Sequence, residues 1–302
     1  ISGANLTAVN AVNGGRKNLI INGGFDVWQR GTSFTTDNVF TADRWKSGDG
    51  TGGSPARTAS RQAFTVGQTD VPNEPAYYLR HNQTGVSTNG NSSISYKSEG
   101  VRTGAGQQVT LSFYSKSSST LDYRIRIIQN FGSSGSTDVA HYDTNHSIGT
   151  SWTKTTITTT LPSISGKTVA GGDDTLNINI DCTSTSTYTF DLAQVQLELG
   201  STATDFEHRS YGEELALCQR YYQILDGAGS SYKGYSSGAY QSTTVCRGLI
   251  PVFVSFRAQP TITFTGSFRI VGDSSRSISS ISGVHWAGGL GFSATTGSTT
   301  QG

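Results

Sequence analysis

Charged side chains are scarce in this sequence. They make up 14% of the chain, and the formal net charge is +1, with no run of lysine or arginine. A nucleic acid or an anionic membrane would therefore gain no electrostatic attraction. Long apolar runs are also missing, because no stretch approaches the roughly 20 residues needed to span a bilayer. We expect no nucleic-acid partner and no membrane insertion.

Methionine is absent, and cysteine occurs three times. The chain opens with "ISGANLTAVNAV", which has no basic segment ahead of an apolar one. We therefore expect a fragment or a processed product of a longer chain. Cys182, Cys218 and Cys246 are odd in number and irregularly spaced, which fits neither a disulfide framework nor a zinc site. They are predicted to be free thiols that pack as small hydrophobic residues.

Small polar residues and glycine fill the composition instead. Hydrophobic residues are 34% of the chain and glycine occurs 37 times, a balance typical of a β protein with many strands and loops. The 13 tyrosines, 13 phenylalanines and 4 tryptophans argue against disorder. At 302 residues, two domains are a better expectation than one.

Short runs with an alternation of period two dominate the first two thirds of the chain. Residues 1–16 are expected to be a tether, and runs such as "QQVTLSFYSK", "LDYRIRIIQ" and "TLNINIDC" then recur between turn signals. In the last run, Leu176, Ile178, Ile180 and Cys182 share one face. About eight such strands predict an all-β fold, a jelly-roll-like antiparallel sandwich over residues 17–208.

The stretch "FEHRSYGEELALCQRYYQ" interrupts this pattern with helix-forming residues. Ser210 and Glu213 have the spacing of a capping box, so a linking helix is predicted over 209–226. At 100° per residue its apolar side chains cover about half of the circumference. Such a wide arc predicts burial on two sides, either between domains or also in a subunit interface; the arc contains Leu215, Leu217, Cys218, Tyr221, Tyr222, Ile224 and Leu225.

Strand signals resume after the helix. Residues 227–302, with runs such as "TTVCRGLIPVFVSF", are predicted to form a small C-terminal β domain. A domain of this size has a marginal core by itself. Pairing with further copies of the chain would supply the missing burial.

Motifs that carry catalysis are missing. There is no phosphate-binding glycine loop, G-x-S-x-G elbow or H-E-x-x-H motif, and no repeat of a β-helix. A glycosidase needs two nearby carboxylates, and the available acids lie in no recognisable pattern: Asp43, Asp49, Asp70, Glu74 and Glu99. We expect no enzymatic activity.

The densest set of potential metal ligands is "TDVAHYDTNHS", which contains Asp138, His141, Asp143 and His146. The two histidines are five residues apart, a poor match to the i, i+4 pair of a helical site. The segment is predicted to be a solvated loop.

Aromatic rings that stack on sugars would carry glycan binding, with polar tips fixing orientation. The candidates are Tyr77, Tyr78, Tyr96, Tyr123, Tyr142, Trp152, Tyr232, Tyr235, Tyr240 and Trp286. The densest group lies in "SSYKGYSSGAYQS", whose glycine-rich setting is unsuited to a regular core strand. We predict glycan contacts at Tyr232, Tyr235, Tyr240 and Trp286.

Two segments carry a resemblance to a known group. They are "NLIINGGFDVWQRGTSF…FTADRWK" (18–46), with Trp28, Arg30 and Trp45, and "DLAQVQLELGSTATDFEHRSYGEELALCQRYYQ" (191–223). Together they resemble bacteriophage virion proteins, mostly tail-fibre or receptor-binding proteins and related structural proteins of marine and cyanobacterial phages. Fibres of this group are usually threefold, so the resemblance implies a homotrimer.

The "NLIINGGFD…W" opening and the "FDLAQVQLELG" strand also resemble the first and last strands of jelly-roll carbohydrate-binding modules. Such modules often hold a structural calcium between those strands. The resemblance implies Asn22, Asp26 and Asp191 as ligands, with Asp26 where those modules usually carry glutamate. Calcium takes six to eight oxygen ligands.

The combined interpretation is a phage virion protein, the distal receptor-binding part of a tail fibre, located on the virion exterior. Its expected partners are copies of itself, other virion proteins and a host surface glycan, with several copies giving avid attachment. Two alternatives stay open. One is a capsid decoration or head-fibre protein, and the other is a carbohydrate-binding module of a secreted glycan-degrading enzyme.

Overall fold

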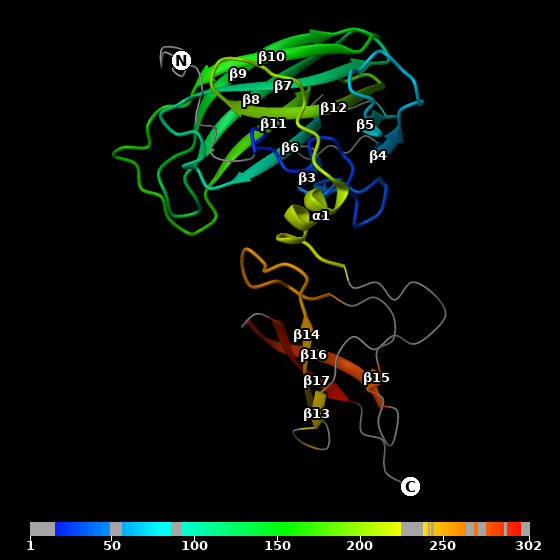
Figure 1. Cartoon of the computed structure of the whole chain (residues 1–302), viewed down its shortest axis with the longest axis vertical. Coiled ribbons are helices and arrows are strands. Elements are labelled where there is room, and N and C mark those ends of the chain that lie inside the picture. Colours follow the sequence, from blue (N-terminus) through cyan, green and yellow to red (C-terminus); the bar gives the residue numbers. More distant parts are fainter. Residues whose placement is uncertain are drawn as a thin grey trace, which may run out of the picture. The chain divides into compact units, whose positions relative to one another are not determined.

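The computed structural model describes residues 16–48, 56–85, 92–224, 238–240, 242, 245–263, 269–270, 276–286 and 289–296. The chain divides into two compact units, Ile1–Leu215 and Ala216–Gly302. Figure 1 shows the strands of both units, and each unit is described by itself below.

The first unit consists of two antiparallel six-stranded sheets. In spatial order, the first sheet contains β1 (Ser33–Phe34), β4 (Arg57–Ala63), β5 (Tyr77–Gln83), β12 (Tyr188–Leu199), β7 (Gln108–Ser117) and β10 (Thr153–Thr160). The second sheet contains β2 (Val39–Phe40), β3 (Trp45–Gly48), β6 (Ser92–Glu99), β11 (Thr175–Cys182), β8 (Leu121–Asn130) and β9 (Val139–Ile148). The predicted all-β, jelly-roll-like sandwich is confirmed.

One hydrophobic core lies between these sheets. Successive side chains of a strand point to opposite faces, so alternate residues of each sheet enter the core. Leu176, Ile178 and Ile180 of β11 are fully buried, as the alternation predicts. Burying one such side chain stabilises the fold by about 1.5–3 kcal/mol.

The segment predicted to be a solvated loop is strand β9. Residues Val139–Ile148 pair with β8 along its length, so the loop prediction is wrong. The strand is at the edge of the second sheet, and most of its side chains are exposed or half-buried. An edge strand with little burial does not need alternating apolar residues, and the sequence therefore lacked a strand signal.

The helix is shorter than predicted. Helix α1 spans Tyr211–Gln219, six residues short of Leu225, which lies outside the described residues. Ser210 Oγ accepts a bond from Glu213 N at 3.3 Å, so the predicted cap is present. Beyond Gln219, the amide Nε2 of Gln223 caps the Gln219 carbonyl at 3.2 Å. Tyrosine and isoleucine are weaker helix formers than the alanine and leucine before them, which favours an end at this point.

Only part of the predicted apolar arc therefore lies in the helix. Leu215 and Leu217 are half-buried and Cys218 is buried within α1, whereas Tyr221 and Tyr222 follow its end and are half-buried. Whether this segment also meets a second copy of the chain stays a prediction.

The second unit contains an antiparallel five-stranded sheet. Its spatial order is β13 (Gly238–Tyr240), β14 (Val245–Pro251), β17 (Gly289–Thr296), β16 (Arg276–Trp286) and β15 (Arg269–Ile270). All three cysteines are buried, and none of them is joined in a disulfide, as predicted. In the described part of the chain, no helix has the length and apolar character of a membrane span.

Candidate functional site

The first of the two segments singled out in the sequence, residues 18–46, contributes core residues. Trp45 is fully buried, and its ring lies 5.1 Å from that of Phe25 and 5.2 Å from that of Tyr96. Its indole Nε1 donates to the Asn22 carbonyl at 2.9 Å. The tryptophans of this segment therefore stabilise the sandwich rather than offer rings to a ligand.

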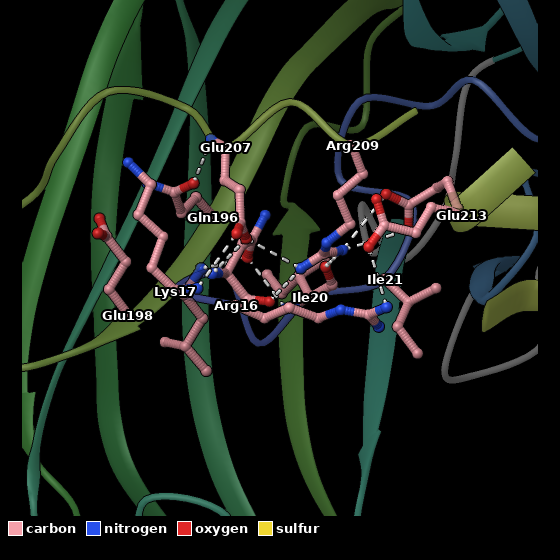
Figure 2. A network of polar contacts seen from close by, with 12 residues as sticks. Arg16, Lys17, Ile20, Ile21, Gln196, Glu198, Glu207, Arg209 and Glu213 are labelled. Atoms are coloured by element: carbon pink, nitrogen blue, oxygen red, sulfur yellow. Dashed lines mark hydrogen bonds and ion pairs between the residues drawn. The ribbon is translucent and has the colours of Figure 1, made fainter. Parts of the chain in front are cut away.

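The second segment folds back onto the first through a buried arginine. The Arg209 guanidinium donates to the carbonyls of Asn18 and Ile20 and pairs with the carboxylates of Glu207 and Glu214. Its side chain is 5% exposed. Figure 2 shows Arg209 between Glu207, Ile20 and their neighbours. We call this group of residues the Arg209 clasp.

Further bonds hold the same two segments together. Glu207 accepts hydrogen bonds from the backbone N–H of Lys17 at 3.3 Å and Asn18 at 2.8 Å, and Glu214 accepts one from Asn22 N at 2.6 Å. Glu213 pairs with Arg16 and does not complete the reciprocal half of the capping box (Figure 2). The two segments that resemble phage proteins thus meet in space, and what they build is a structural clasp.

The three implied calcium ligands already have protein partners or neighbours. The Asn22 side chain bonds to Val27 N, Val27 O and Asp43 O, and it is fully buried. Asp191 forms a two-bond ion pair with Arg80, each bond 2.7 Å long. Asp26 is half-buried. Within the described residues no group of three or more histidine, cysteine or acidic side chains is arranged to hold a metal. The calcium site stays a prediction.

Asp26 makes folding pH-dependent. Burial first, and then the nearby Glu214 carboxylate, raise the pKa of Asp26 from 3.8 to about 6. The folded state therefore binds this proton more tightly than the unfolded state, and the stability contributed at low pH is lost as pH rises through about 6. We expect Asp26→Asn to stabilise the protein at pH 8 by about 1–2 kcal/mol, with little gain at pH 3.5.

The measurement is urea denaturation of both proteins at these two pH values. Asp70→Asn, at an exposed aspartate, is the matched control and should change stability little at either pH. A gain that is equal at both pH values would show that the carboxylate charge is not its cause.

Each acidic or histidine side chain of "TDVAHYDTNHS" has a different partner. Asp138 accepts from Asn130, His141 bonds to Gln129, Asp143 pairs with Arg124, and His146 bonds to Tyr142. The four side chains are thus engaged separately along the β8–β9 pair.

The described acids among those considered for glycoside cleavage lie at three places in the fold. Asp43 is buried beside Arg30, which donates to it at 3.2 Å. Asp70 and Glu74 are exposed between β4 and β5, and Glu99 ends β6. Asp49 lies outside the described residues.

The predicted glycan-contacting aromatics belong to the second unit. Tyr232 and Tyr235 lie outside the described residues. The backbone of Tyr240 pairs with Cys246 at the end of β13, and that of Trp286 pairs with Leu290 at the end of β16. Their role in glycan binding stays a prediction.

Of the other candidates, Tyr96 and Tyr123 are buried in the core. Tyr77 is half-buried under the Arg61 guanidinium, 4.4 Å from its ring centroid, and Tyr142 packs against His146. These four rings are occupied by packing. Tyr78 and Trp152, by contrast, come together on the outer face of the first sheet.

Three half-buried rings form a cluster on that face, which we call the Trp152 cluster: Phe64, Tyr78 and Trp152. Their centroids lie 4.8 Å (Phe64–Tyr78), 5.2 Å (Phe64–Trp152) and 5.3 Å (Tyr78–Trp152) apart. Tyr78 is in β5, and Trp152 directly precedes β10. Strands β12 and β7 lie between these two strands, which places β5 and β10 about 14 Å apart. The rings of Tyr78 and Trp152 therefore lean toward each other across the sheet.

Charged and polar side chains surround the Trp152 cluster. Lys116 lies directly opposite Asp191 in the β7–β12 register, and Lys154 lies opposite Tyr114 in the β7–β10 register. The Lys116 ammonium is 5.1 Å from the Trp152 ring centroid, and the Lys154 ammonium is 5.9 Å from that of Tyr114. The face thus combines flat rings with cationic and hydrogen-bonding groups.

A shallow hollow adjoins these residues. Its enclosed volume is about 10 Å³, and it is lined by Pro72, Asn73, Ser112, Tyr114, Lys154, Gln194, Thr204, Asp205 and Phe206. Gln194 sits at the irregularity of β12 with a φ of 48°. Its Nε2 donates to the Pro72 carbonyl at 2.8 Å, while its buried Oε1 has no hydrogen-bond partner. A ligand donor could satisfy that oxygen.

Sequence reasoning included Tyr78 and Trp152 among ten candidate rings but did not select them, and it did not consider Phe64 or Tyr114. Tyr114, Lys116 and Lys154 occupy outward positions of regular strands, which is the one signal that the sequence held. Their grouping depends on the strand order β5-β12-β7-β10, which brings together segments distant in the chain.

Comparison with protein-family models finds no match to this chain. Comparison with curated proteins finds none either. Among solved structures, the chain is similar to the enzymatically active domain of tailspike protein 4 of bacteriophage CBA120, with a TM-score of 0.42 and 13% identity over 61% of this chain. The chain covers 21% of that tailspike domain.

Two further similar structures differ in function. The family 11 carbohydrate-binding module from Clostridium thermocellum, in complex with a mixed-linked tetrasaccharide, has a TM-score of 0.34 and 16% identity, covering 59% of this chain and 98% of that one. The Stig cyclase Fisc from Fischerella sp. TAU has a TM-score of 0.41 and 14% identity, covering 62% and 98%. At such identities the likeness concerns the fold alone. The class that the fold itself defines is that of all-β sandwich proteins.

Proposed function

We propose that this protein binds a surface glycan through the outer face of the first sheet and serves as an attachment part of a phage particle, the distal part of a tail fibre. The observation that carries the glycan proposal is the Trp152 cluster, with its half-buried rings beside polar side chains. The virion part rests on the sequence resemblance of residues 18–46 and 191–223.

The physical basis is the match between rings and sugars. Flat aromatic faces pack against the apolar faces of sugar rings, and nearby amide, hydroxyl and charged groups bond to the sugar hydroxyls. Arg80 and Lys116 supply such groups next to the rings, and Gln194 lines the adjoining hollow. Binding without cleavage is the activity proposed.

Several copies would strengthen attachment. We propose a homotrimer, as in the fibres that the sequence resembles, because linked weak sites bind a polymer more tightly than one site does. The solution mass measured by light scattering at several concentrations tests this. A monomer at all concentrations would contradict the trimer and favour a carbohydrate-binding module that acts alone.

Trp152→Ala is the direct test of the site. We expect the variant to lose about tenfold or more in affinity for glycans that the wild type binds on an array of bacterial surface polysaccharides, because a stacking ring contributes on the order of 1.4 kcal/mol. Tyr211→Ala removes a ring that is 60% exposed in α1 and should bind as the wild type does.

Both variants must keep the wild-type circular dichroism spectrum and melting temperature for the comparison to hold. A folded Trp152→Ala variant with unchanged affinity would refute the site. Binding to purified phage capsids instead of glycans would favour the head-fibre or capsid-decoration alternative.

A further inference from the structure

The first sheet carries two lysines that pair with no carboxylate in the described part of the chain. Lys116 and Lys154 direct their ammonium groups at the rings of Trp152 and Tyr114, respectively. Five arginines of the same unit, by contrast, form ion pairs with acids: Arg30, Arg80, Arg124, Arg126 and Arg209. The two lysine charges are thus available to a ligand.

The carboxylate opposite Lys116 already pairs with an arginine. Asp191 lies opposite Lys116, but both of its oxygens accept bonds from Arg80, and its side chain is 2% exposed. Arg80, Lys116 and Lys154 therefore share this part of the face with two carboxylates, Asp191, which Arg80 engages, and the exposed Asp205 of the adjoining hollow. An ammonium held over a ring keeps its charge and can still bind an anion on its open side.

The spacing of the lysines suits a polymer with repeated charges. Lys154 is opposite Tyr114, two residues from Lys116 on the same outward face, so the two lysines are diagonal neighbours about 7–8 Å apart at their backbones. Long lysine side chains adjust this span to successive anionic groups. The Trp152 ring lies beside Lys116, and Lys154 follows Trp152 by two residues in the chain.

The hollow next to Lys154 makes the charge of the face different at its two ends. Asp205, an exposed acid, lines that hollow together with Tyr114 and the unpartnered Oε1 of Gln194. Burial, and then the Asp205 charge, raise the pKa of Tyr114, so its hydroxyl stays a neutral donor at physiological pH. An anionic group is favoured toward Lys116 and disfavoured toward Asp205, where neutral hydroxyls fit.

We infer that the ligand is an anionic polysaccharide, whose carboxylate, sulfate or phosphate groups are held by Lys116 and Lys154 while its sugar rings stack on the Trp152 cluster. This inference rests on the proposed glycan site and specifies the class of glycan that the site takes. A lysine ammonium is a compact point charge, so it attracts anions in general. It does not distinguish a carboxylate from a sulfate or a phosphate.

The test compares matched pairs of polymers on one array: polygalacturonate with its carboxyl-reduced form, and dextran sulfate with dextran. The wild type should bind the anionic member of each pair at least tenfold more tightly, with an affinity that falls as salt rises from 50 to 200 mM. The two pairs separate carboxylate from sulfate recognition.

Three variants assign the effect to this face. Lys116→Gln with Lys154→Gln should lose about tenfold in affinity for anionic polymers and show a weaker salt dependence, whereas Asp205→Asn should gain a few-fold. The matched control is Lys46→Gln with Lys97→Gln, which removes the same charge from β3 and β6 of the second sheet and should leave binding unchanged.

The outcomes separate this inference from the proposed function. Neutral and anionic polymers bound equally well, with Trp152→Ala still weakening both, would overturn the anionic ligand and leave the glycan site standing. Equal losses in the two double-lysine variants would also overturn it, because the effect would then be net charge alone. No binding to any polymer by the wild type would overturn both proposals.

Discussion

Replacing Arg209 with alanine is expected to lower the free energy of unfolding of the first unit by about 3–5 kcal/mol. The guanidinium is almost fully buried and serves two carboxylates, Glu207 and Glu214, and two backbone carbonyls. Removing one partner of a buried ion pair leaves charges without compensation in a medium that solvates them poorly, which is why the cost exceeds that of an ordinary hydrogen bond.

Urea denaturation followed by tryptophan fluorescence measures this loss, because Trp45 lies in the core of the same unit. Arg16→Ala is the matched control. Arg16 pairs with Glu213, but the two side chains are 45% and 47% exposed, so its removal should cost less than about 1 kcal/mol. Arg209→Lys keeps the charge but lacks the planar fork, so an intermediate loss is expected. Equal losses for Arg209→Ala and Arg16→Ala would contradict the buried clasp.

The sandwich could be predicted from the sequence because its central strands are buried on a regular face. In β11, the alternation of Leu176, Ile178 and Ile180 with polar residues is the direct imprint of a core on one side. Strand β9 carries no such imprint, because at the sheet edge its residues are mostly solvated. Edge strands follow from pairing with a neighbour, and pairing is not visible in a local pattern.

The strand β9 was missed, whereas the helix was predicted to be longer than it is. Its start is encoded locally by the Ser210 cap, and the prediction was confirmed there. Its end depends on contacts made by later residues: Gln223 bonds to the Gln219 carbonyl and also to backbone atoms of Phe253 and Val254. Those partners lie about 30 positions further along the chain, beyond the reach of a helical-wheel argument.

The residues that carry the sequence resemblance are different from those that form the candidate glycan site. The segments that resemble phage proteins build the core around Trp45 and the Arg209 clasp. The Trp152 cluster and its lysines lie within residues 64–154, for which the sequence offered no resemblance. A scaffold shared with other proteins can therefore carry a ligand face of its own, and the resemblance informs about the fold more directly than about the ligand.

The last expected result concerns a close backbone contact between residues 18–46 and residues 191–223. Gly23→Ala should destabilise the first unit by about 3–5 kcal/mol, or prevent folding, because a Cβ at this position would lie 2.0 Å from the carbonyl oxygen of Val195. The obstacle is backbone, which cannot rotate away as a side chain can. Val195 N also donates to the Gly23 carbonyl at 2.9 Å, so separating the chains would break that bond.

Gly212→Ala supplies a control with the opposite sign. No atom lies within 4 Å of a Cβ at Gly212, which is in α1, so alanine there should stabilise the helix by up to about 1 kcal/mol. Urea midpoints of the two variants, or soluble yields if Gly23→Ala fails to fold, make the comparison. The requirement at residue 23 is thus steric. A Gly23→Ala variant as stable as the wild type would mean that the two segments do not approach this closely.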